Sequence, residues 1–262
     1  MYVEMDDFRQ SYVVAVNEIR KFIRGKKFLV YGLLVVLAFA LFVILPFASG
    51  QGFHDFYQID HVIIPAGIVP AFLSFMNIIV ILGATLFASN VLVSEFEDRT
   101  ALVLFTRPVK RTSIFIGKII GCIVIETVVI VIYYLAIAVV SQAADGFVPT
   151  ELFVSLGITF MYIVAASGVA ILISSIMKRS GTSAVLTFFS LLLIIPIVSL
   201  IFMIAFGDAW YILNIAASTL APTFADGVYF PIVNVARTCG VMFVWGIVSM
   251  VLSWMIFVKR EF

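Results

Sequence analysis

FLVYGLLVVLAFALFVILPF, residues 28–47, is a run of twenty residues without a single charged side chain. A helix of this length rises about 30 Å, which matches the hydrocarbon core of a bilayer. The run is too long for the apolar region of a signal peptide, and no small-residue cleavage site follows it. The stretch therefore predicts a retained transmembrane helix.

The composition extends this prediction to the whole chain. Hydrophobic residues make up 63% of the sequence, charged residues 12%, and the mean hydropathy is +1.20, whereas about a quarter of the residues of a soluble domain are charged. The net charge of +1 gives no indication of nucleic-acid binding. Apolar runs near twenty residues, rather than short alternating segments, predict an all-α integral membrane protein. The six predicted spans are residues 28–47, 62–93, 114–140, 152–177, 183–206 and 235–258.

Two of these spans carry a further feature. Residues 62–93 would form a helix of about 48 Å, too long for one untilted span. Pro65 and Pro70 suggest a separate piece at its start, and its other end is expected to project into the cytoplasm. Pro196 lies in the middle of the fifth span and predicts a kink there.

Lysine and arginine placement predicts the orientation. Fifteen of the 16 basic residues lie before the first span, in the segment from Arg99 to Lys118, between spans four and five, or after the sixth. The sixteenth is Arg237, just inside the sixth span. Because basic residues concentrate on the cytoplasmic side, both termini are expected there, in a multi-pass protein of the plasma membrane. The fifteen are Arg9, Arg20, Lys21, Arg24, Lys26, Lys27, Arg99, Arg107, Lys110, Arg111, Lys118, Lys178, Arg179, Lys259 and Arg260.

Residues 1–27 form a separate N-terminal segment ahead of the transmembrane domain, residues 28–262. Apolar side chains recur in it at three- and four-residue steps, and most charged ones lie elsewhere. The pattern predicts an amphipathic helix in the inner membrane interface. The alternative is a basic tail that only sets the topology. The apolar positions are Phe8, Tyr12, Val16, Ile19 and Ile23.

The main polar interruption between apolar runs is SEFEDRTALVLFTRPVKRTSIFIGK, residues 94–118. Apolar side chains stand between two groups of charges, which is unusual for a passive loop. The pattern predicts a cytoplasmic segment that docks on another protein, whereas the alternative is a solvated loop whose charges obey the positive-inside rule.

This segment resembles the cytoplasmic motif of type 2 ABC transporter permeases. In that family a Glu follows the second span, as Glu95 does here, and a Gly-Thr pair comes soon after. A leucine-rich stretch then ends in Arg-Pro-hydrophobic-x-Arg, as residues 104–111 do, and Gly117-Lys118 matches the Gly-Lys that opens the third span. Arg99, before Thr100, stands where the family usually has Gly.

The resemblance implies a permease subunit without a cofactor of its own. The sequence lacks the G-x-x-x-x-G-K-[ST] phosphate loop, so ATP and Mg would be bound by a separate cytoplasmic ATPase. Two copies of the permease would pair with two ATPases, and residues 94–113 would be the coupling segment that docks on them. The docking residues would be Glu95, Phe96, Glu97, Asp98, Arg99, Thr100, Leu102, Leu104, Phe105, Arg107, Pro108 and Arg111.

Glu126 lies near the middle of the third span, where a carboxylate costs on the order of 3 kcal/mol to insert. Two interpretations remain open for it. One is a packing residue, protonated or hydrogen-bonded to a neighbouring helix, and the other is a group in the transport path or its gate. Asn77 and Asn90 in the second span are expected to hydrogen-bond between helices.

The two long outer connections suggest little chemistry. Residues 207–234 are apolar and carry Trp210, Pro222 and Pro231, a pattern that predicts short re-entrant helices, as the family has, with a seventh span as the alternative. The first outer loop holds residue types that suit a transition metal but match no firm motif. These weak candidates are His54, Asp55, Asp60 and His61.

The sequence therefore predicts the permease subunit of an ATP-driven exporter, with no catalytic residues of its own. It would move its substrate at a homodimer seam that, by resemblance, includes parts of spans two and five. One alternative is a membrane subunit that transmits force without moving a substrate. Another is an integral membrane enzyme, although Glu126 is the one plainly intramembrane acid.

Overall fold

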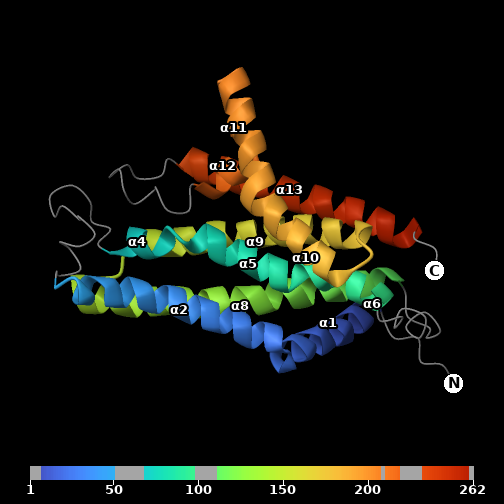
Figure 1. Ribbon diagram of the computed structural model, residues 1–262, viewed down its shortest axis with the longest axis horizontal. Helices are drawn as coiled ribbons and strands as arrows, with labels where there is room; N and C mark the ends of the chain where they lie inside the picture. Colours follow the sequence, from blue (N-terminus) through green and yellow to red (C-terminus); the bar gives the residue numbers. More distant parts are fainter. Residues whose placement is uncertain (1–6, 51–67, 98–110, 208–209, 219–231, 260–262) are drawn as a thin grey trace.

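The computed structural model describes residues 7–50, 68–97, 111–207, 210–218 and 232–259, and every regular element in these ranges is a helix. Six segments of the described chain are long and apolar enough to cross a membrane, as predicted. They are Lys26–Ala48, Val69–Asn90, Arg111–Ala144, Leu152–Ile176, Ser180–Phe206 and Val235–Lys259, numbered here as spans one to six. Figure 1 shows α2, α4–α5, α8 and α9 running side by side, with α13 along the same bundle.

The second span is more broken than its sequence predicts. It consists of α4 (Val69–Leu73), α5 (Met76–Leu86) and the 3-10 turn η1 (Ala88–Asn90), and the short helix α6 (Val93–Glu97) follows it. The expected break at Pro65 lies outside the described residues. The breaks persist because side chains of other helices bond the free backbone groups, as when the Tyr133 hydroxyl donates to the Phe72 carbonyl at 2.9 Å.

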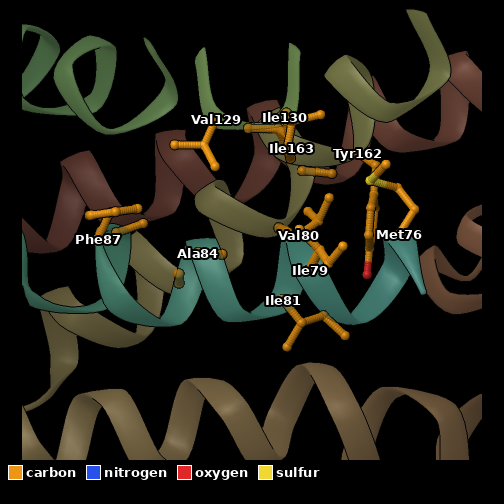
Figure 2. Packing of buried hydrophobic residues seen from close by; sticks show 14 of the residues in the cluster. Met76, Ile79, Val80, Ile81, Ala84, Phe87, Val129, Ile130, Tyr162 and Ile163 are labelled. Carbon is orange, nitrogen blue, oxygen red and sulfur yellow. The ribbon is translucent and has the colours of Figure 1, made fainter. Parts of the chain in front are cut away.

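The broken span is nevertheless the centre of the bundle. Apolar side chains of α5 pack with those of α8 (Arg111–Asp145) and α9 (Glu151–Ile176), as Figure 2 shows. Tyr31 of α2 (Lys26–Ala48) is fully buried against the same span and donates to the Ile79 carbonyl at 3.2 Å. Within Val69–Asn90 only Ser74, Phe75 and Ile78 are exposed.

Glycine allows α9 and α13 (Ile232–Lys259) to cross at close range. A Cβ atom on Gly168 would lie 2.9 Å from the Gly246 carbonyl oxygen. In a membrane such small-residue contacts replace the hydrophobic drive that packs helices in water, because lipid is as apolar as the helix surface. The contact attaches span six to span four, and Ser253 adds a hydrogen bond to the Ile171 carbonyl at 3.2 Å.

The N-terminal helix α1 (Asp7–Arg24) has the predicted amphipathic pattern, but it uses a second face as well. Phe8, Tyr12 and Ile23 of the predicted apolar face are exposed, which suits contact with lipid. The adjoining face, with Ser11, Ala15, Glu18 and Phe22, is buried, and its Ser11 and Ala15 lie close to α8. The helix is therefore a packed part of the domain as well as an amphipathic one.

Span five leaves the bundle, as Figure 1 shows for α11. It consists of α10 (Ser180–Phe189), the π turn η2 (Ser190–Ile194) and α11 (Ile195–Phe206). The π turn lies immediately before Pro196, whose missing N–H relaxes the local hydrogen-bond ladder. All residues from 200 to 207 are exposed, so α11 has little cover within one copy of the chain.

A short helix, α12 (Leu213–Ser218), lies between spans five and six. It packs beside α13 with Leu213, Ala216 and Ala217 buried. The Trp245 indole donates to the Tyr211 carbonyl at 2.9 Å and holds the segment before α12 to span six. A helix is thus present in the segment predicted to be re-entrant. Residues 208–209 and 219–231 of that segment lie outside the described chain.

Candidate coupling site and the buried carboxyl of span three

One end of the bundle gathers the basic residues, and we call it the basic end. Figure 1 shows α1, α6, the start of α10 and the end of α13 at this end. Its described basic side chains outside α1 are Lys26, Lys27, Arg111, Lys178, Arg179 and Lys259. The predicted coupling segment, residues 94–113, begins in α6 and ends in the first turn of α8.

The structure describes four of the twelve predicted docking residues. Glu95, Phe96 and Glu97 form the last turn of α6, and Arg111 is the first residue of α8. The other predicted docking residues lie outside the described chain: Asp98, Arg99, Thr100, Leu102, Leu104, Phe105, Arg107 and Pro108.

Glu97 caps the start of span five. Its carboxylate accepts hydrogen bonds from the Ser180 hydroxyl and, at 2.8 Å, from the Ser180 backbone N–H. These two bonds lower the pKa of the Glu97 carboxyl, the hydroxyl contributing more than the backbone. The negative charge of Glu97 also lies beside the first residue of α10, where the positive end of the helix dipole stabilises it. The contact joins the coupling segment directly to span five.

Serines of two other spans bond the broken end of span two. The Ser174 hydroxyl of α9 accepts from the backbone N–H groups of Leu92 and Val93, at 3.2 and 3.1 Å. The Ser183 hydroxyl of α10 donates to the Ser89 carbonyl at 2.6 Å. A break in a membrane helix is tolerated where such partners exist. The end of span two is therefore attached to spans four and five.

Asn90 extends this network to span one. With its amide oriented to satisfy both ends, its nitrogen donates to the Ser180 carbonyl at 3.0 Å and its oxygen accepts from the Lys27 ammonium at 3.0 Å. Asn77 accepts from the Tyr162 hydroxyl of α9 at 2.5 Å. Both asparagines thus bond between helices, as predicted.

Arg111 points toward span six. Its guanidinium donates to the Val258 carbonyl at 3.5 Å, and one turn further along α8 the rings of Phe115 and Phe257 lie 5.7 Å apart. Lysine and arginine side chains complement the carbonyls that end a helix. The two ends of the coupling segment therefore touch different helices: α6 touches span five, and α8 touches span six.

Glu126 is fully buried between spans two, three and four. The Ser167 hydroxyl of α9 donates to its Oε2 atom at 3.2 Å. On the other side a Cβ atom on Gly83 would lie 2.6 Å from Oε1, so the glycine makes room for the carboxyl. The predicted packing contact with a neighbouring helix is present, and a role in transport stays a prediction.

The sequence did not reveal the acid that pairs with Lys118. The Lys118 ammonium forms an ion pair with Glu18 of α1, and both side chains are buried. Gly117 and Gly121 flank the lysine on α8, and a Cβ atom on either would lie within 3 Å of α1. In the sequence, the Gly-x-x-x-Gly spacing around the intramembrane lysine could have indicated a close helix contact here.

The weak metal candidates His54, Asp55, Asp60 and His61 lie outside the described residues. Among the residues that the structure describes, no group of three or more His, Cys, Asp or Glu side chains is placed to hold a metal ion.

The family model for the ABC-2 family transporter protein matches residues 12–262, nearly the whole chain. The chain belongs to this family. No individual curated protein matches it. Membership agrees with the six apolar spans and supports a permease subunit of an ABC transporter rather than an enzyme. Membership of the family implies association with ABC ATPase partners.

Proposed function

We propose that this permease is the membrane subunit of an ATP-driven exporter and couples ATP hydrolysis by a separate cytoplasmic ATPase to substrate movement. Two copies of the chain act with two ATPases. Residues 94–113 dock on the ATPase, with Leu102, Leu104 and Phe105 as the apolar centre and the surrounding charges as the rim. The basic end faces the cytoplasm, as the placement of lysine and arginine predicts.

The contact between Glu97 and Ser180 carries this proposal. Glu97 lies within the segment that would touch the ATPase, and Ser180 is the first residue of span five. A displacement of Glu97 would therefore reach span five through two hydrogen bonds. The Ser174 and Ser183 bonds deliver the same displacement to spans four and two.

The other end of the segment acts on a second group of helices. Arg111 begins α8 and touches span six, and α8 is joined to α1 through Lys118 and Glu18. When the two ATPases close on ATP, the segment moves both helix groups at once. The substrate path then opens or closes by rocking of the spans around the dimer seam.

The second copy is expected along span five. The exposed residues 200–207 of α11 are apolar except for the final glycine, whereas span two exposes only three residues between Val69 and Asn90. A second copy that packs on α11 would give this span the helix contacts that it lacks within one chain. Span five is thus favoured over span two as the main wall of the seam.

The test is a co-purification of the permease with its ATPase. The double variant Leu104→Asp/Phe105→Asp should abolish recovery of the ATPase, because it places two charges in the apolar centre of the docking surface. The matched control is Gln142→Asp/Ala143→Asp, which adds two charges at exposed positions of α8 far from the basic end. Undiminished ATPase binding by the Leu104/Phe105 variant, with both proteins folded, would reject the coupling role of the segment.

A further inference from the structure

Arg237 occupies an unusual place in the molecule. It is the sixth residue of α13 and lies about 33 Å along that helix from Lys259, at the membrane surface opposite the basic end. The other 15 lysines and arginines lie in the segments from which the sequence predicts the cytoplasmic side. Because a basic residue on the opposite side works against the positive-inside rule, its presence calls for a local reason.

The surroundings of Arg237 form a shallow, open groove beside α13. The groove has a volume of about 380 Å³, within the roughly 300–1,000 Å³ of ligand pockets. The Arg237 guanidinium lies 4.9 Å from the centre of the Trp210 ring, a cation–π contact that fixes its direction. Among the residues that the structure describes, no carboxylate pairs with it. The groove is lined by Trp210, Tyr211, Arg237, Gly240, Val244 and Trp245, together with Val241.

The groove combines an apolar wall with one cationic group, and a phospholipid combines an acyl chain with a phosphate. The aromatic and valine side chains offer an apolar wall to an acyl chain, and tryptophan and tyrosine favour the level of the lipid headgroups. The guanidinium offers a planar set of donors to phosphate oxygens. Gly240 leaves the floor open, since a Cβ atom placed there would meet no atom within 4 Å.

We propose that this groove binds an anionic phospholipid of the membrane leaflet opposite the basic end, with the phosphate on Arg237 and one acyl chain along α13. The site does not depend on the transport activity proposed above, because binding needs neither ATP nor the ATPase. A zwitterionic lipid would contact the same apolar wall and also carries a phosphate, but its own ammonium competes with the guanidinium for that charge, so an anionic lipid should bind more tightly.

The three tryptophans of the chain allow a direct measurement. Trp210 and Trp245 line the groove, whereas Trp254 lies near the basic end of α13. In the full-length Trp254→Phe protein, fluorescence therefore reports on the groove alone. The protein is placed in phosphatidylcholine vesicles that contain increasing fractions of either brominated phosphatidylglycerol or brominated phosphatidylcholine. The bromine atoms quench a tryptophan that touches the lipid chain.

Half-maximal quenching is expected at about a fivefold lower fraction of the anionic lipid, the gain given by one basic side chain at an anionic surface. Arg237→Gln should remove this difference, and Arg237→Lys should keep most of it because the charge remains. Gly240→Leu fills the groove and should weaken quenching by both lipids. Gly157→Leu on α9 is the matched control, since it too has open space at its Cβ, and it should leave quenching unchanged.

Three results would overturn the proposal. Equal half-maximal fractions for the two lipids would remove the headgroup preference, and an unchanged preference in Arg237→Gln would remove the arginine from the site. Loss of self-association in Gly240→Leu with unchanged quenching would assign the groove to a second copy of the chain. Thermal unfolding of each purified variant checks that the protein is folded.

Discussion

The carboxylate of Glu18 pairs with the ammonium of Lys118 in the buried seam between α1 and α8. Exposed Lys21 approaches the same carboxylate, with its Nζ atom 3.8 Å from the other Glu18 oxygen. Gly117 and Gly121 let the two helices come close enough for the pair to form. The N-terminal helix is therefore attached to α8, the helix that begins at the end of the coupling segment.

Removing one member of this pair should be strongly destabilising. Lys118→Gln leaves the Glu18 carboxylate buried beside a single exposed ammonium, and the expected loss is about 3–5 kcal/mol. Glu18→Gln/Lys118→Gln removes both charges and should recover most of it, because two amides can bond each other. Thermal unfolding of the purified protein measures both variants. A double variant as unstable as Lys118→Gln would show that the charges themselves do not decide stability.

The contact between Gly83 and Glu126 makes a second prediction. Gly83→Ala places a methyl group within 3 Å of three side-chain atoms of Glu126 and should cost about 1–3 kcal/mol. In a Glu126→Ala background the same change meets open space and should cost little. A double-mutant cycle of unfolding free energies measures the coupling, and equal costs in the two backgrounds would argue against the contact.

Two substitutions of Glu126 separate packing from a role in transport. Glu126→Gln keeps the size and can still accept from Ser167, so it should be silent if the residue only packs. Glu126→Leu leaves Ser167 without its partner and should lower the unfolding free energy by about 1–3 kcal/mol. A pathway or gating role would instead show as altered coupled ATPase activity in the folded Gln variant. Both variants are measured for thermal stability and for ATP turnover with the ATPase bound.

The Glu97 carboxylate should hold the first turn of α10 in a pH-dependent way. Its pKa is lowered by Ser180, so the folded state favours the charged form. The stabilisation is present above the ordinary carboxyl pKa and is lost as the pH falls through the lowered value. Hydrogen exchange of the α10 amides, corrected for intrinsic rates, should show this loss in the native chain. Glu97→Gln should show weaker protection near neutral pH and no such transition, and an unchanged transition would assign it to another group.

Labelling of introduced cysteines tests the orientation. In a chain without Cys122 and Cys239, cysteines at Gln51 and Ala144 should react with an impermeant reagent in intact cells. A cysteine at Thr112 should react only after the membrane is opened, because the basic end faces the cytoplasm. Labelling at Thr112 from outside would reverse the topology.

The sequence alone determined the class of the protein and the number of its spans. Membrane insertion depends on the length and apolarity of each run separately, so residues 28–47 and the five later runs could be recognised without knowing their neighbours. The same holds for the amphipathic pattern of α1, because a helix imposes a fixed period on its own residues. The resemblance of residues 95–118 to a permease motif agreed with the family match.

Only the tertiary structure decided where the helices break and what holds them. The break before α5 and the break between η1 and α6 are bonded by Tyr133 and Ser174, which come from other spans and give no local sign in residues 69–97. The partner of Lys118 lies a hundred residues earlier, and the partner of Glu97 lies eighty-three residues later. Such pairings arise from packing in three dimensions, where a hydrogen bond or an ion pair depends on distance in space and not on separation along the chain.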